Sequence, residues 1–317
     1  MNSHETFTSS AYPPSSPKYN PAEYWEGLID VPAYGWRFTF DQIKRESPSR
    51  RITDTSKRIG FTVECQKRAK GIVFMFACCR QLKLSRSVAL TASYYYHRFY
   101  MRRDFSYYHY FEIAATCLFI ACKAEECRRK LADVVKVCAS IAMWGKMNDT
   151  IDEDSKIYWK WKDTITNLEE LLLEVLCFDV TPENAYKVCL RSLDLEFDEE
   201  PAKEDEVEKR KSQQIFVICT NFFEILARLP LLLMFDTETI CALGTAFSCK
   251  QEKRTMKEHF LTQKLNVRVE DVWKCYNTAI ELANSLEPLR PSFRVLESLP
   301  RLDQEELSGI LGVGVKN

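Results

Sequence analysis

Apolar residues recur at helical spacing over most of the chain after residue 60. The clearest stripes predict five helices that follow one another with short connections. The first is expected near residues 61–82, where apolar positions lie three or four residues apart. Its stripe consists of Cys65, Ala69, Ile72, Phe76 and Cys79. The other four helices are expected at residues 86–100, 109–124, 131–142 and 155–178, with Thr181–Pro182 ending the last one.

The predicted helix at residues 109–124 is apolar nearly all round, so we expect it to be the central helix of a compact bundle. Charges appear abruptly at its end, where "AATCLFIACKAEE" closes with Lys123, Glu125 and Glu126. The negative end of the helix dipole favours a lysine by about 0.3 to 1 kcal/mol and disfavours acids to a similar extent. The two glutamates therefore either lead into the next helix or face the positive charges of a partner.

The second half of the chain repeats this scheme less clearly. Helical patterns return at residues 211–228, 236–250 and 268–286. The runs "AATCLFIACK" and "CALGTAFSCK", 127 residues apart, are both apolar helices with small residues and share an alanine, a cysteine and a lysine. The sequence therefore predicts an all-α protein with two tandem helical bundles.

Three segments have the composition of solvent-exposed chain. Residues 1–21 are rich in Ser, Pro, Asn and Tyr and are expected to be a mobile tail, as are residues 291–317. Residues 194–208 hold nine acids against one lysine and are expected to be a solvated insertion. The first bundle with an N-terminal extension then occupies residues 22–180, and the second bundle occupies residues 181–290.

Composition limits the classes of function. The 317 residues are 46% hydrophobic and 28% charged with a formal net charge of −1, which argues against a surface built throughout for nucleic-acid phosphates. The sequence has no apolar run of about 18 residues and no signal or transit peptide features, so we expect a soluble intracellular protein with no membrane partner. Its 13 cysteines include no Cys-x-x-Cys pair and are interpreted as buried residues in a reducing compartment, not as metal ligands.

Catalytic motifs are missing from the sequence. It contains no phosphate-binding glycine loop, no dinucleotide fingerprint, no nucleophile elbow and no zinc-protease motif. The run "HRFYM" is similar to the start of a kinase catalytic loop, but Phe99 stands where that loop needs an aspartate. We therefore expect no catalytic residue, no cofactor and no enzymatic activity of the chain itself.

Several runs carry a resemblance to a known family. The segments "HRFYM", "AATCLFIACKAEECRRKLADVV" and "LEELLLEVLCFDVTP" resemble the first cyclin box. The upstream "GWRFTFDQIKRESPSRR" and the later "SKIYWKWKDTI" are similar to the transcriptional cyclins of the T and K type and their fungal relatives. The resemblance is strong over residues 34–182 and weaker in the second half. It implies two tandem five-helix cyclin boxes and a role as the activating subunit of a cyclin-dependent kinase.

The resemblance also implies a binding surface. In cyclins, the lysine that ends the third helix and a glutamate of the fifth contact the kinase around its regulatory C helix, and the matching residues are Lys123 and Glu169. Apolar positions at the end of the fifth helix receive the kinase helix. Together with the two glutamates after Lys123, the candidate kinase contacts are Lys123, Glu125, Glu126, Glu169, Leu173, Phe178 and Val180.

The transcriptional branch implies a nuclear heterodimer. Its expected substrates are the heptad-repeat C-terminal domain of RNA polymerase II and associated elongation factors. The kinase is either the elongation kinase that uses T-type cyclins or the related polymerase-tail kinase that uses K-type cyclins. The substrate-docking motif of cell-cycle cyclins is reduced to fragments in "KRAKGIVFMF", so docking through that patch is not expected.

Two alternatives keep the same fold. A general transcription factor of the TFIIB type also uses two cyclin-fold bundles, but it begins with a zinc ribbon and has basic bundles, whereas this chain has no Cys-x-x-Cys pair and is slightly acidic. Direct DNA binding is therefore not expected. The other alternative is a cyclin-fold scaffold that binds a kinase without activating it.

Two features upstream of the first bundle have open interpretations. Residues 44–70 carry nine Lys or Arg against three acids, and this excess would either be a solvated surface or attract phosphorylated tails, RNA or an import receptor. Ser47 precedes Pro48 and is either a phosphorylation site or an ordinary turn starter.

Overall fold

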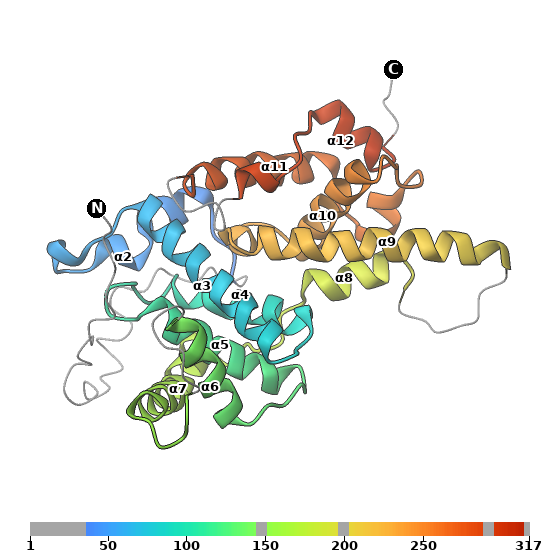
Figure 1. The fold of residues 1–317 in the computed structure, drawn as a ribbon. Helices are drawn as coiled ribbons and strands as arrows, with labels where there is room; N and C mark the ends of the chain where they lie inside the picture. Colours follow the sequence, from blue (N-terminus) through green and yellow to red (C-terminus); the bar gives the residue numbers. More distant parts are fainter. Residues whose placement is uncertain (1–35, 144–150, 196–202, 288–294, 314–317) are drawn as a thin grey trace.

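The computed structural model describes residues 36–143, 151–195, 203–287 and 295–313, and all regular structure in these ranges is helical (Figure 1). This confirms the predicted all-α class. The predicted tail at residues 1–21 lies outside the described residues.

Five helices form the first bundle, and their apolar faces meet around one of them. This central helix is α5, whose residues from Ile113 to Cys122 are all buried. It packs against the other four helices of the bundle, as the sequence predicted. The bundle consists of α3 (Phe61–Gln81), α4 (Arg86–Phe99), α5 (Tyr110–Ala124), α6 (Leu131–Ala142) and α7 (Lys156–Val175), preceded by η1 (Gln42–Glu46), α2 (Pro48–Arg51) and η2 (Thr55–Lys57).

The second half repeats the arrangement around α10, which is buried from Thr239 to Cys249. Helices from both sides of α10 in the sequence pack against it. Its neighbours include two helices that periodicity did not predict, α8 and α12. The elements are α8 (Ala185–Ser192), α9 (Lys203–Leu226), η3 (Pro230–Leu233), α10 (Thr237–Gln251), η4 (Leu261–Leu265), α11 (Val269–Asn284), η6 (Leu296–Ser298) and α12 (Gln304–Ile310).

The fifth predicted helix ends earlier than expected. Helix α7 stops at Val175, and Cys177 and Phe178 follow with left-handed φ angles of 53° and 57°. Their N–H groups donate to Glu174 O and Leu173 O, both at 2.9 Å, and close the last turn. The helix is therefore ended by a left-handed turn, and the prediction that Thr181–Pro182 ends it is wrong.

The predicted tail at residues 291–317 is wrong for residues 295–313. Leu302 N donates to Tyr276 Oη at 3.0 Å, and Lys250 Nζ lies 2.6 Å from Glu306 Oε1. The leucines and isoleucine of this segment pack against α10 and α11. The helices of this segment have too few turns to give a periodic pattern of apolar residues in the sequence. The buried residues are Val295, Leu299, Leu302, Leu307, Ile310 and Leu311.

The acidic segment at residues 194–208 divides at the start of α9, because residues from Lys203 onward are helical. Glu206 and Glu208 are exposed, as a solvated segment requires. Asp194 pairs with Lys264, whose Nζ lies 2.7 Å from Oδ1. Residues 196–202 lie outside the described residues.

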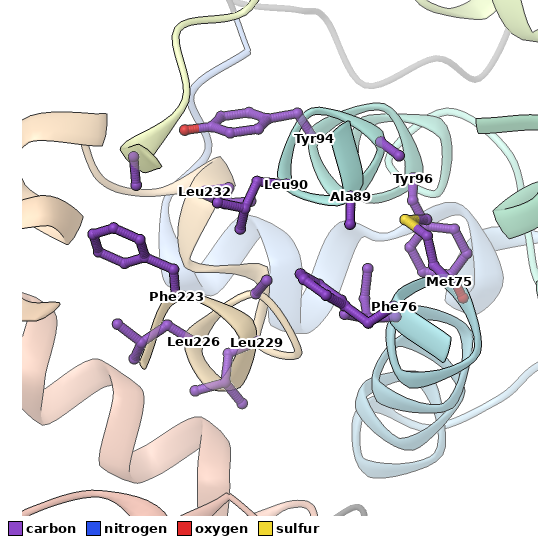
Figure 2. Packing of buried hydrophobic residues seen from close by; sticks show 14 of the residues in the cluster. Met75, Phe76, Ala89, Leu90, Tyr94, Tyr96, Phe223, Leu226, Leu229 and Leu232 are labelled. Carbon is purple, nitrogen blue, oxygen red and sulfur yellow. The ribbon is translucent and has the colours of Figure 1, made fainter. Parts of the chain in front are cut away.

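The two bundles share an apolar contact. Leu90 and Tyr94 of α4 lie beside Phe223 and Leu226 of α9 (Figure 2). Tyr94 Oη is 2.7 Å from Thr237 Oγ1 at the start of α10. These contacts fix α4 against the second bundle.

A buried ion pair joins the N-terminal segment to the first bundle. Arg68 and Glu64 are one turn apart on α3, with side chains 0% and 1% exposed, and Arg68 Nη2 donates to Glu64 Oε1 at 2.7 Å. Arg50 Nη1 and Ser47 Oγ donate to Glu64 Oε2 at 2.9 and 2.6 Å. Arg68 also donates to the carbonyl oxygen of Tyr100 at 3.1 Å.

This network bears on both open interpretations of the upstream segment. Ser47 is wholly buried and its hydroxyl is held by a carboxylate, so in the folded chain a phosphate has neither access nor a favourable charge there. Burial of Ser47 disfavours its phosphorylation in the folded chain and favours the turn interpretation, since Ser47 directly precedes α2. Part of the basic excess at residues 44–70 is neutralised inside the fold, because Arg50 and Arg68 both form ion pairs with Glu64.

His97 is held as a neutral imidazole next to Arg68. The guanidinium can only donate, so Nδ1 accepts from Arg68 Nη1 at 3.3 Å and Nε2 donates to Ala227 O at 2.9 Å. Burial, and then the charge of Arg68, lower the pKa of His97 from 6.5 to about 3.

Replacing Glu64 should be strongly destabilising. Glu64→Gln leaves Arg68 as an uncompensated buried charge, so the free energy of unfolding in urea should fall by about 3 kcal/mol or more. The matched control is Glu281→Gln, which breaks an exposed pair with Lys44 and should cost less than about 1 kcal/mol. Equal losses in the two variants would contradict the structural role of the buried pair.

His97 should also make stability depend on pH. Its folded pKa lies below its unfolded value, so its full contribution is present above pH 6.5 and is lost as the pH falls toward 3. Between about pH 7 and about pH 5 the wild-type free energy of unfolding should fall by about 2 kcal/mol more than that of His97→Gln. Parallel pH curves for the two proteins would contradict a neutral His97.

Candidate functional site

Lys123 and Glu169 form an ion pair at the surface of the first bundle. Lys123 lies in the last turn of α5 and Glu169 lies on α7, which packs against α5. Lys123 Nζ is 2.5 Å from Glu169 Oε1 and 4.3 Å from the centroid of the Phe119 ring. The side chains remain 50% and 25% exposed. The structure thus brings together the two residues that the resemblance had singled out separately.

The two glutamates that follow Lys123 have different surroundings. Helix α5 ends at Ala124, so both lie in the turn after it and neither carboxylate belongs to the last helical turn. Glu125 is directed inward and is 13% exposed. Glu126 is exposed, and its left-handed φ of 55° turns the chain toward α6.

Glu125 connects three helices. Its Oε1 accepts from Thr91 Oγ1 of α4 at 2.7 Å, and its Oε2 lies 2.9 Å from Lys187 Nζ of α8. The amide of Asn184, the N-cap of α8, donates to the same Thr91 hydroxyl at 2.9 Å. Glu125 therefore holds α8 of the second bundle against α4 and α5. The sequence missed this role because the partners lie 34 and 62 positions away.

The apolar candidates at the end of α7 also differ in exposure. Leu173 is partly buried and packs against the core, so it is not the exposed leucine that its position off the apolar stripe predicted. Val180 is also partly buried, and its carbonyl accepts from Tyr95 Oη at 2.5 Å. Phe178 is 68% exposed. It is therefore the apolar side chain that this end of the bundle presents to solvent.

The segment that carries Phe178 is fixed from behind by α4 and the turn after it. Arg98 Nη1 donates to Asp179 Oδ2 at 3.0 Å, and Arg102 Nη1 donates to Cys177 Sγ at 3.3 Å. Phe178 N donates to Leu173 O, and Leu173 lies one turn after Glu169 on the same face of α7. We group Lys123, Glu169, Leu173 and Phe178, which lie at the ends of α5 and α7, as the α5–α7 surface.

Chemical groups on the α5–α7 surface suit recognition. They are one cation, one carboxylate and apolar side chains, held by helices with little freedom to move. In the described ranges there is no group of three or more His, Cys, Asp or Glu side chains that could hold a metal ion, and no helix there is long and apolar enough to cross a membrane. The only highly exposed cysteine among the described residues is Cys177, while burial raises the pKa of Cys65 and Cys122 to about 12.

The sequence of the first bundle matches known proteins. Residues 37–181 match the family model of the cyclin N-terminal domain. Cyclin pch1 of Schizosaccharomyces pombe is 46% identical over 124 residues, which are 39% of this chain and 36% of that protein. Cyclin-T1 of Mus musculus is 30% identical over 152 residues, 48% of this chain and 20% of that protein. Cyclin-K of Homo sapiens is 27% identical over 180 residues, 56% of this chain and 28% of that protein.

The matched part is a minor share of each of these relatives, between 20% and 36% of their length. The predicted resemblance to T-type and K-type cyclins is nevertheless confirmed by these relatives.

Solved structures agree with the fold. The yeast RNA Pol II CTD kinase CTDK-1 complex contains a chain that matches with a TM-score of 0.59 and 16% identity, over 86% of this chain and 80% of that chain. A chain of the CAK complex of Chaetomium thermophilum matches with a TM-score of 0.53 and 14% identity, over 87% and 86%. At these identities the likeness concerns the fold alone. Residues 37–181 are therefore similar to the cyclin N-terminal domain, and T-type and K-type cyclins are among the relatives of this part of the chain.

Proposed function

We propose that this chain is the regulatory subunit of a nuclear cyclin-dependent serine/threonine kinase that acts on the C-terminal repeat domain of RNA polymerase II and on elongation factors. The observation that carries the proposal is the α5–α7 surface, where the Lys123–Glu169 pair lies on a rigid platform with exposed Phe178. The relatives support the transcriptional branch, and one structure of similar fold comes from a polymerase-tail kinase complex.

The ion pair is suited to contact a partner because it is held weakly in the free chain. A surface pair of this kind contributes about 0 to 1 kcal/mol, since solvent screens both charges. A docking protein that removes solvent can strengthen the pair or offer each charge a new partner at little cost. Lys123 and Glu169 are also directed by packed helices, which limits the side-chain entropy lost on binding.

Phe178 supplies the apolar part of the proposed contact. Most of its surface is in water although a left-handed backbone, the Arg98–Asp179 pair and the Tyr95 hydrogen bond fix its position. Covering such a side chain contributes about 1.5 to 3 kcal/mol. An exposed aromatic residue on a fixed backbone is a typical binding anchor.

The proposed mechanism is a shift between kinase conformations. A free kinase of this class holds its C helix and activation segment mostly in unproductive positions. The α5–α7 surface would bind the productive arrangement more tightly and so increase its population. The chain would contribute no catalytic atom, and the catalytic partner would be either the elongation kinase or the related polymerase-tail kinase.

A co-purification experiment tests the proposal as a whole. The tagged full chain is expected to bring down a protein kinase at low salt, and the eluate should phosphorylate a polymerase-tail substrate. Mass spectrometry of the eluate distinguishes the two candidate kinases. A kinase in the eluate without added activity would favour a non-activating scaffold, and absence of any kinase would overturn the proposal.

Charge reversal at the ion pair separates binding from folding. Lys123→Glu and Glu169→Lys should each weaken kinase association by about tenfold or more, with an unchanged melting temperature. The control Lys136→Glu breaks a similar exposed pair with Glu153 on another face and should leave association unchanged. The double variant Lys123→Glu/Glu169→Lys rebuilds the internal pair with reversed polarity. It should still bind poorly, whereas full recovery would mean that the pair serves only the fold.

Truncation of Phe178 tests the apolar part. Phe178→Ala should weaken kinase association by about tenfold and leave the free energy of unfolding within about 0.5 kcal/mol of wild type, because the ring is mostly in water. Val217→Ala is the matched control, since Val217 is 59% exposed on α9. Titration calorimetry with the co-purified kinase checks the difference, and equal affinities for the two variants would place the contact elsewhere.

A further inference from the structure

Away from the α5–α7 surface, two segments bring cations together beside the junction of the bundles. Residues 80–86 contain three cations and no acid, and residues 126–130 contain three cations and one acid. We call their six cations the arginine surface. They are Arg80, Lys83, Arg86, Arg128, Arg129 and Lys130.

Hydrogen bonds between the two segments show that they are neighbours. Arg129 Nε and Nη2 donate to Leu82 O and Lys83 O, both at 3.2 Å, which fastens the α5–α6 turn to the α3–α4 turn. Arg86 Nη1 donates to Thr220 Oγ1 of α9 at 2.7 Å, and Arg80 Nη1 lies 2.9 Å from Glu224 Oε1. The arginine surface therefore spans both turns of the first bundle and reaches α9.

Most of the positive charge on this surface is not neutralised from within. The acids beside these cations are Glu126, which is exposed, and Glu224 of α9, which forms an ion pair with Arg80. Behind Glu224 lies Arg228. Burial lowers the pKa of Arg228. The charge of Glu224 raises this pKa and the charge of Arg80 lowers it, so Arg228 is a seventh cation close to the other six. The result is a local basic surface on a chain whose net charge is only −1.

The bonds already made leave donors available for a ligand. A guanidinium carries five N–H donors, and Arg80 and Arg86 each use Nη1 in their contacts with α9. Lys83, Arg86, Arg128 and Lys130 are all exposed, and the side chain of Arg80 is 60% exposed. Guanidinium forks fit the oxygens of a phosphate with two parallel hydrogen bonds, and four of the six cations are arginines.

We propose that the arginine surface binds phosphoserine- or phosphothreonine-containing segments of a partner protein. This site is separate from the α5–α7 surface and does not depend on the proposed kinase partnership. A phosphoryl group carries about −1.5 to −2 charges and three acceptor oxygens, so it satisfies several of these donors at once. Because the cations lie on turns and helix ends fixed by hydrogen bonds, they need little reorganisation to receive it.

The same features argue against nucleic acid as the occupant. Single-stranded nucleic acid binds where aromatic side chains stack on bases beside a basic groove. The large apolar side chains that are exposed in the described ranges all lie outside the arginine surface. They are Val63, Tyr107, Trp159, Phe178, Val207 and Val217.

Fluorescence polarisation with the purified full chain tests the proposal. The probe is a labelled peptide with two phosphoserines, compared with the same peptide unphosphorylated, the same peptide with glutamates in place of the phosphoserines, and a single-stranded RNA. The phosphopeptide should bind with an affinity that falls as salt is raised, and about tenfold or more tighter than the other three probes. Equal binding of the glutamate peptide, tighter binding of RNA, or no binding of the phosphopeptide would each overturn the proposal.

Charge reversal locates the site. The triple variant Lys83→Glu/Arg128→Glu/Lys130→Glu changes exposed residues whose side chains make no hydrogen bond or ion pair with the described residues. It should therefore fold normally and bind the phosphopeptide about tenfold or more weakly. The control Arg51→Glu/Lys156→Glu/Lys274→Glu makes the same change of net charge on exposed residues elsewhere and should bind within about twofold of wild type. Equal losses in both variants would reduce the effect to overall charge. Circular dichroism and melting temperature confirm that each variant is folded.

Discussion

A helix that is apolar on every side is stable in water only when other helices cover it on every side. Helix α5 imposes this constraint on the first bundle, because its residues from Ile113 to Cys122 are all buried. Helices α3, α4, α6 and α7 satisfy it, and α10 imposes the same constraint on the second half. At the end of α5 the neighbouring helices no longer cover it on every side. Lys123 therefore reaches solvent beside α7, and its pairing with Glu169 follows from the packing of these two helices.

Buried charge adds specificity to this apolar scheme. Glu64 and Arg68 lie inside the bundle, and hydrogen bonds from Ser47 and Arg50 bring the upstream segment to them. Taking two charges out of water is unfavourable unless every donor and acceptor is matched, so the arrangement tolerates few alternatives. The neutral imidazole of His97 belongs to the same network and extends it to Ala227 beyond α9. A single set of buried polar groups thus fixes the N-terminal segment, the first bundle and the chain after α9 relative to one another.

The turn after α5 separates the two surfaces for which we propose partners. Lys123 faces α7 on one side of the turn, and Arg128 to Lys130 lie beyond it near the α3–α4 turn. Glu125 between them is held inward by Thr91 and Lys187, so it is a structural link from α5 to α8 in this chain. The eight residues 123–130 around one turn thereby contribute to an ion pair, an internal link and a basic surface. This is possible because the left-handed φ of Glu126 reverses the direction of the chain.

Local periodicity was enough to predict the helices of the first bundle and the central position of α5, because the spacing of apolar residues indicates which faces of a helix are buried. Residues 295–313 escaped prediction because their helices are too short for a period to show, and the end of α7 was misplaced because a left-handed turn without glycine or proline leaves no clear signal in sequence. The residues of the candidate site were identified through their resemblance to cyclins. Whether each of them is paired, buried or exposed could not be predicted from that resemblance. Only the tertiary structure decided that Lys123 and Glu169 pair and that Glu125 is directed inward. It also decided that Ser47 is buried and that Phe178 is exposed to water. Each of these states depends on contacts between side chains far apart in the sequence.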